Sequence, residues 1–126
     1  MHSLMVRKDF IASHYLVGGD WGKECEPHAH RYVLDLVLEG QSLDENNYLV
    51  DILRVEEVLG SVIARYRDKL LNDLPEFKGQ NPSIELFSKF LAKRLSEGIG
   101  DPRVTSLGVT LWETESAWAR YELPRR

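Results

Sequence analysis

Apolar and polar residues alternate over residues 28–41, and this pattern limits the folds that the chain can adopt. Every second residue of this segment is apolar or aromatic, apart from two histidines at its start, and this set is His28, His30, Tyr32, Leu34, Leu36 and Leu38. A period of two predicts a β-strand with one buried face. The two histidines would continue that face, so they would lie at the edge of a buried layer.

A partner for this strand precedes it. Apolar and charged residues alternate from Val6 to Tyr15, which places Phe10, Ala12 and His14 on one face. Residues 17–23 contain three glycines, which favours a loop that returns the chain antiparallel. In such a hairpin, His14 can lie beside the two histidines of the second strand.

These three histidines suit a catalytic zinc ion. Three imidazole nitrogens leave a fourth position open for water or substrate, whereas structural zinc sites usually close with four protein ligands, commonly several cysteines. Only one cysteine, Cys25, is present. We therefore predict that His14, His28 and His30 bind Zn²⁺; the alternative is a polar, exposed His-x-His pair without metal.

Two helices and a second hairpin should follow. Apolar residues spaced three or four apart between Ile52 and Leu70 predict a helix of about five turns. A second stripe from Ile84 to Leu95, preceded by Asn81-Pro82, predicts another helix. Strands are expected at residues 104–113 and 117–123. The order ββααββ predicts an α+β fold, with both helices packed on one face of a four-stranded antiparallel sheet.

Length and charge narrow the classes of function. The 126 residues predict one domain, residues 1–126, and 16 basic against 20 acidic side chains argue against nucleic-acid binding. No stretch is apolar enough to span a membrane or to act as a signal peptide, so we expect a cytoplasmic protein. Two open sheet edges and the aromatic side chains Phe77, Trp112, Trp118 and Tyr121 predict a homo-oligomer.

Six motifs in order resemble the 6-pyruvoyl-tetrahydropterin synthase and 6-carboxytetrahydropterin synthase family, which has the T-fold, or tunnelling fold. They are Phe10-x-Ala12-x-His14, Cys25-Glu26-Pro27-His28-Ala29-His30, Asp51, Leu71-Asn72-Asp73, Asn81-Pro82-Ser83-x-Glu85 and Glu113-Thr114. The resemblance implies a homo-oligomer, typically a hexamer built from trimers. It also implies zinc-assisted proton abstraction and elimination on the side chain of a reduced pterin such as 7,8-dihydroneopterin or its triphosphate.

The resemblance also implies roles for individual residues. Glu113, with Thr114 beside it, would bind the pterin, because a carboxylate can accept both N–H groups of the ring's guanidine-like edge. Ser83 and Glu85 are candidates for substrate contact, although fastening the start of the second helix is an equal alternative. Asp51 could likewise be only a helix cap. In the family a thiolate near the metal and an Asp-His pair transfer the protons.

The proton-transfer residues depart from the family pattern. The usual motif is Cys-x-x-x-His-Gly-His, but Cys25 precedes His28 by only three positions, and Glu24 occupies the place four positions before it. Either Glu24 or Cys25 could be the base, since a one-residue shift turns a side chain the other way. Relatives that cleave the side chain in an aldolase-like manner use glutamate there. Cys25 could also be a small buried thiol without function.

The second proton shuttle lacks its histidine. Depending on the alignment, Asp68 keeps its role with Lys69 in the histidine's place, or Arg67 and Asp68 replace the pair. Asp68 and Lys69 could also form a solvated pair on a helix. We therefore predict a zinc-dependent pterin side-chain lyase or synthase. The alternatives are a catalytically impaired paralogue that binds zinc and pterin without the Asp-His dyad, and an oligomeric scaffold with neither metal nor ligand.

Overall fold

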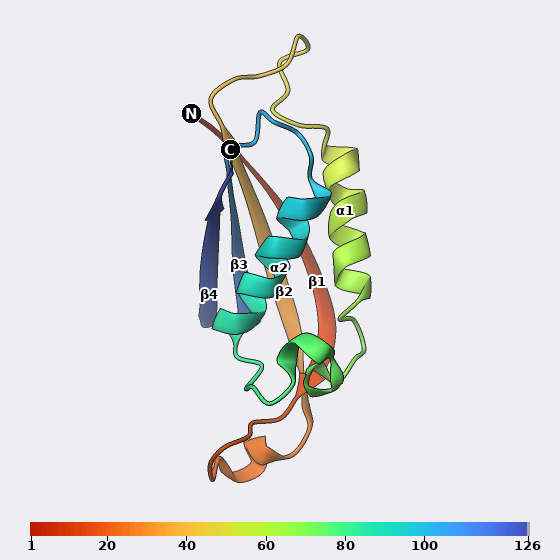
Figure 1. Cartoon of the computed structure of the whole chain (residues 1–126), viewed down its shortest axis with the longest axis vertical. Helices are drawn as coiled ribbons and strands as arrows, with labels where there is room; N and C mark the ends of the chain where they lie inside the picture. Colours follow the sequence, from red (N-terminus) through yellow and green to blue (C-terminus); the bar gives the residue numbers. More distant parts are fainter. Residues whose placement is uncertain (126) are drawn as a thin grey trace.

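The two alternating segments form the first hairpin of a four-stranded antiparallel sheet. The computed structural model describes residues 1–125, and its strands lie side by side in sequence order. Their bounds are β1 (His2–His14), β2 (His28–Gly40), β3 (Ser106–Thr114) and β4 (Ala117–Pro124). Both helices cover the same face of this sheet (Figure 1). The predicted α+β arrangement and the ββααββ order are therefore confirmed.

The first hairpin is longer than its sequence pattern indicates. β1 begins at His2, four residues before the predicted start, and pairs with β2 from the His2–Gly40 pair to the His14–His28 pair. Even-numbered residues of both strands face the helices. Those of β2 from Tyr32 to Leu38 are completely buried. The open face of the sheet carries the odd-numbered residues.

Helix α1 (Ile52–Ala64) lies over β1, and helix α2 (Ile84–Gly98) lies over β3 and β4 (Figure 1). Asp51 caps α1 by accepting a hydrogen bond from the Leu53 amide, and Ser83 caps α2 by accepting one from the Leu86 amide. Such caps satisfy amides that have no partner within the helix. The structure therefore shows Asp51 and Ser83 as helix caps, which is the alternative to a role in substrate contact.

The first helix is shorter than predicted. It ends at Ala64, where the Arg65 amide bonds back to the Val62 and Ile63 carbonyls, and residues 65–68 form a turn. Asp68 has a left-handed backbone (φ 60°), which an α-helix does not allow. Apolar spacing of three or four also fits this turn, because Tyr66 is buried without being helical. Asp68 and Lys69 therefore do not form a pair on a helix.

A polar cluster joins the end of α1 to α2. Two short helices, η2 (Leu71–Asp73) and η3 (Pro75–Phe77), fill the connection. Glu76 in η3 accepts hydrogen bonds from Arg65, from the Tyr66 hydroxyl and from Arg94 of α2. Arg65 first, then a backbone amide and the Tyr66 hydroxyl, lower the pKa of Glu76 to about 2. The cluster holds the connection against both helices.

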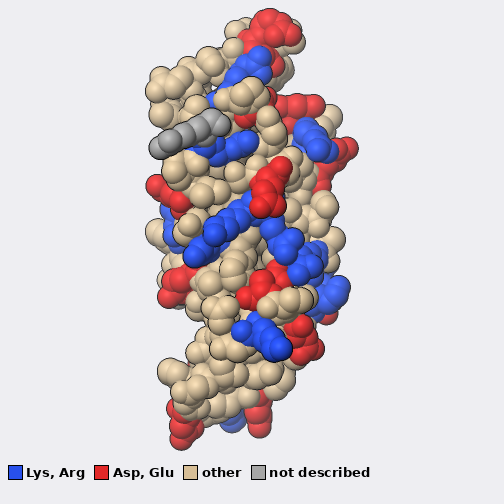
Figure 2. Space-filling model, in the orientation of Figure 1, with Lys and Arg blue, Asp and Glu red and all other residues tan. Residues whose placement is uncertain are grey.

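The surface over the helices carries charges of both signs. Lys and Arg side chains alternate with Asp and Glu side chains across this face (Figure 2). Within residues 1–125, no helix has the length and apolar character needed to cross a bilayer.

Candidate metal centre and active site

Three histidines converge where β1 ends and β2 begins. His14 lies directly opposite His28 in the hairpin, and His30 lies two pairs further along, opposite Ala12. Because all three lie on the face under the helices, their rings meet with centroids 4.6 to 5.0 Å apart. One nitrogen of each ring lies within 4.8 Å of the other two. The predicted grouping is therefore present.

The nitrogens that face away from this cluster are held in place. The Tyr32 hydroxyl lies 3.0 Å from Nδ1 of His14, and Nδ1 of His28 lies 2.9 Å from the Glu26 carbonyl oxygen. Such contacts orient a metal-binding imidazole and select its tautomer. The Tyr32 ring is itself fixed, because it stacks on Phe10 and meets Phe87 edge-on.

The chemistry of the cluster fits a metal ion. Burial first, then His30 and His28, lower the pKa of His14 to about 4, so this ring is neutral near pH 7. Metals bind neutral imidazole. Nε2 of His30 is buried and has no hydrogen-bond partner among residues 1–125. A buried ring nitrogen without a partner is costly unless a ligand satisfies it, so His14, His28 and His30 suit zinc.

Two asparagines anchor the loop that follows His14. Asn72 of η2 accepts a hydrogen bond from the Tyr15 amide and donates one to the Tyr15 carbonyl, directly after His14. Asn81 accepts one from the Val17 amide. The Asn72 and Asn81 motifs noted in the sequence therefore position the end of β1.

Glu113 reaches the histidines from a third strand. The pairing of β2 with β3 stops at Val33 and Trp112, so residues 28–32 of β2 are not paired with β3. Glu113 sits there as the extra residue of a bulge between β3 and β4. Bulges redirect a side chain, and here the carboxylate Oε1 lies 3.1 Å from Nε2 of His30 and 3.9 Å from Nε2 of His14.

A cavity of about 180 Å³ opens beside the cluster and contains most of the predicted site residues. His14, His28, Glu24, Ser83, Glu85 and Glu113 line it. Three carboxylates therefore share one small cavity with two of the three histidine rings. The Ser83 hydroxyl is already used as the helix cap, while Glu85 lies in the first turn of α2 with its side chain exposed.

Glu24 and Cys25 point to different places. Both belong to the short helix η1 (Gly22–Cys25), and Glu24 lines the cavity. The Cys25 thiol instead accepts a hydrogen bond from the Trp21 amide and donates one to the Gly19 carbonyl, within its own loop. Cys25 is exposed, so the alternative of a buried thiol is wrong.

Asp68 lies outside this cavity. Its amide donates to the Ile11 carbonyl of β1, and the Lys69 carbonyl accepts from the Ser13 amide, so the segment runs along the edge of β1. The side chains of Asp68 and Lys69 are exposed. Neither residue lines the cavity that contains His14 and Glu24.

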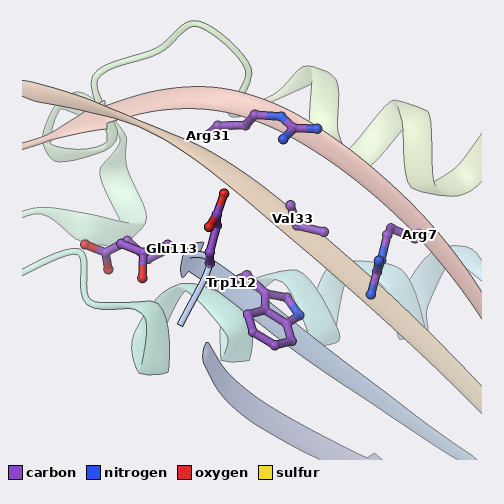
Figure 3. Close-up of a pocket in the computed structure, with 7 residues that line it drawn as sticks. Arg7, Arg31, Val33, Trp112 and Glu113 are labelled. Atoms are coloured by element: carbon purple, nitrogen blue, oxygen red, sulfur yellow. The ribbon is translucent and has the colours of Figure 1, made fainter. Parts of the chain in front are cut away.

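A second hollow, of about 510 Å³, lies on the open face of the sheet and shares only Glu113 with the first (Figure 3). Trp112 borders it, and its indole nitrogen donates to Asp35, which also accepts from Arg7. Thr114 lines this hollow and not the histidine cavity. In Figure 3 the Glu113 carboxylate points toward β2. Glu113 therefore stands at the border of both spaces.

Two features of the site escaped the sequence patterns. Tyr32, the partner of His14, lies two residues after His30 on the same face, so the alternation of the strand could have identified it. The bulge at Glu113 left no such signal, because it results from how β3 pairs with β4.

Comparisons with known proteins agree with this arrangement. The model of a family described as 6-pyruvoyl tetrahydropterin synthase matches residues 3–124. A 6-pyruvoyl tetrahydrobiopterin synthase of Dictyostelium discoideum is 28% identical over 103 residues, which make up 80% of this chain and 74% of that protein.

Solved structures of 6-pyruvoyl tetrahydropterin synthases have the same fold as this chain. The 6-pyruvoyl tetrahydropterin synthase of Caenorhabditis elegans superposes with a TM-score of 0.85 at 19% identity, over 97% of this chain and 95% of that one. A Plasmodium vivax 6-pyruvoyltetrahydropterin synthase, in which a catalytic glutamate is replaced by alanine, gives 0.81 at 17% identity over 98% of both chains. The predicted T-fold is confirmed.

Proposed function

The chain belongs to the 6-pyruvoyl tetrahydropterin synthase family, and from that membership we propose that it is a zinc-dependent lyase acting on the side chain of a reduced pterin. The observation that carries this proposal is the convergence of three imidazoles, two of which line one cavity together with Glu24. The proposed substrate is 7,8-dihydroneopterin or its triphosphate.

His14, His28 and His30 would hold the zinc ion. When bound, zinc supplies Lewis-acid stabilisation of negative charge that develops on a substrate oxygen. Tyr32 and the Glu26 carbonyl keep two of the rings oriented for this task. The buried edge of the sheet excludes water from one side of the cluster, since His14 is 3% exposed.

We assign the base to Glu24. Glu24 lines the cavity, and its carbonyl accepts a hydrogen bond from the amide of Leu16 (2.8 Å), which lies two residues after His14. The Cys25 thiol is engaged within its own loop. The Plasmodium vivax relative with a catalytic glutamate supports a carboxylate in this role.

Glu113 is the proposed pterin anchor. A carboxylate can accept two parallel N–H bonds from the guanidine-like edge of the ring, and charge-assisted bonds of this kind are strong. Glu113 borders the hollow on the open face, where Trp112 and Val33 supply apolar surface for a ring. Thr114 lines the same hollow, and Glu85 remains available to the substrate from the histidine cavity.

One observation favours a second candidate, a catalytically impaired paralogue that binds zinc and pterin. Asp68 does not line the cavity, and the fourth histidine, His2, lies at the far end of β1, paired with Gly40. The family's second proton shuttle therefore has no counterpart at this site among the described residues. Loss of a general acid or base typically costs 10²–10⁴-fold in rate.

Product analysis after incubation with 7,8-dihydroneopterin triphosphate, and separately with 7,8-dihydroneopterin, distinguishes the candidates. Turnover above that of free zinc supports the lyase, and Glu24→Gln should then lower kcat about 10²–10⁴-fold. The matched variant Cys25→Ser should react at nearly the wild-type rate. Pterin binding without turnover supports the paralogue. Zinc-free protein purified without chelators would contradict both.

We also propose that the chain forms a homo-oligomer. Its four strands leave the outer edges of β1 and β4 open for much of their length, and Met5, Ile11 and Trp118 are exposed on the open face of the sheet. Open strand edges favour pairing with another chain.

A further inference from the structure

The position of Glu113 poses a geometric problem for a pterin anchor. The guanidine-like edge of a pterin lies across two fused rings from the side chain that the metal would engage. The carboxylate, however, lies among the metal-binding nitrogens, with Oε1 3.1 Å from Nε2 of His30 and 3.9 Å from Nε2 of His14. In this position Glu113 is at the metal end of the site and not at the ring end.

The contact between Glu113 and His30 is not a hydrogen bond. Nε2 of His30 has no hydrogen-bond partner among residues 1–125, although the carboxylate oxygen is 3.1 Å away. Two donor atoms bound to the same tetrahedral zinc ion lie about 3.3 Å apart, given ligand distances of about 2.0 Å. The separation between the Glu113 and His30 atoms is close to this value.

We infer that Glu113 occupies the fourth zinc position when no pterin is bound, and that pterin draws this carboxylate away to its ring edge. This inference rests on the zinc site and the pterin anchor of the proposed function. It adds that one side chain serves the metal and the substrate in turn.

The surroundings of Glu113 allow both positions. Among the described residues, Glu113 alone lines both the histidine cavity and the hollow on the open face, so rotation about its side-chain bonds would move the carboxylate between them. The side chain is 26% exposed and makes no hydrogen bond with the described residues that would hold it in either place. The bulge sets its backbone at the boundary.

Zinc affinity, measured by competition with a chelator at fixed pH, tests the first half of the inference without any turnover. Glu113→Gln keeps the size of the side chain but loses its charge, and Glu113→Asp keeps the charge but shortens its reach. Both should raise the zinc Kd at least about tenfold. Glu115→Gln, which changes an exposed neighbour that lines only the open hollow, should leave the zinc Kd unchanged.

The absorption spectrum of the Co²⁺-substituted protein tests the second half. Neopterin, which keeps the ring edge and the side-chain hydroxyls of the proposed substrate, should shift the visible bands of the wild type. Glu113→Gln should have a different spectrum before neopterin is added, because its fourth position is already open. Thermal unfolding of each variant verifies that it is folded.

Two results would overturn the inference: wild-type zinc affinity in Glu113→Gln, or identical cobalt spectra for the wild type and Glu113→Gln without pterin. Failure of the proposed lyase activity is a separate result. A chain that consumes no pterin but loses zinc affinity on Glu113→Gln would refute the lyase and retain the carboxylate ligand.

Discussion

A single hydroxyl orients His14, the most buried of the three proposed zinc ligands. Tyr32 contacts Nδ1 of His14, and both side chains are almost completely buried, at 0% and 3% exposure. Burial raises the pKa of Tyr32, so its oxygen stays a neutral hydroxyl, which can accept a hydrogen bond from Nδ1–H of His14. In that tautomer Nε2 of His14 carries no proton and is free for a metal.

Replacing Tyr32 by phenylalanine should therefore weaken zinc binding more than it weakens the fold. Loss of such a supporting contact typically costs 10- to 100-fold in metal affinity, and we expect a change of about that size in the zinc Kd. The control is Tyr66→Phe, which removes another buried hydroxyl, the one bonded to Glu76. That variant should lose stability to denaturant while keeping its zinc affinity. Equal zinc affinities in the two variants would refute the orienting role.

At the scale of elements, η2 locks the end of β1 to the site. Asn72 makes two hydrogen bonds to the backbone of Tyr15, one to its amide and one to its carbonyl. Tyr15 directly follows His14 in the chain. Asn72→Ala leaves these partly buried backbone groups without partners, at a cost of about 1–3 kcal/mol in the free energy of unfolding. Zinc affinity should fall as well. Asn46→Ala, on an exposed turn, should change neither quantity.

The hydrogen bonds to Glu76 should make the free energy of unfolding fall at low pH. The pKa of Glu76 is about 2 in the folded chain against an ordinary 4.5, so its stabilising effect is complete above pH 4.5 and is lost as the pH falls through about 2. The difference corresponds to at most about 3 kcal/mol. Denaturant unfolding between pH 2 and pH 6 should show the wild type more stable than Glu76→Gln near pH 6. A gap that stays constant down to pH 2 would contradict this assignment.

At the scale of the whole molecule, the open face of the sheet is where assembly is expected. Trp118 is 53% exposed there and packs beside Trp112, with ring centroids 6.3 Å apart. Light scattering after size exclusion should give the mass of an oligomer, and Trp118→Glu should shift it toward a single chain, because burying an unpaired charge is costly. Leu53→Glu, on the exposed side of α1, should leave the mass unchanged. A single-chain mass for the wild type would refute the proposal.

Strand periodicity predicted much of this fold and site. Alternation placed His14, His28 and His30 on one face, since side chains two residues apart in a strand must point the same way. Helix spacing predicted α1 and α2 but overran the end of α1, because a turn with Asp68 in a left-handed conformation satisfies the same apolar spacing.

The sequence by itself determined the sheet, the two covering helices and the three converging imidazoles, because each follows from contacts within one strand, one helix or one hairpin. Only the tertiary structure decided that Glu24 and not Cys25 lines the cavity, that Asp68 lies outside it, and that Glu113 reaches the histidines. Those outcomes depend on a short loop helix, a turn and a bulge. In such segments a shift of one residue reverses the direction of a side chain, so residue order alone does not set it.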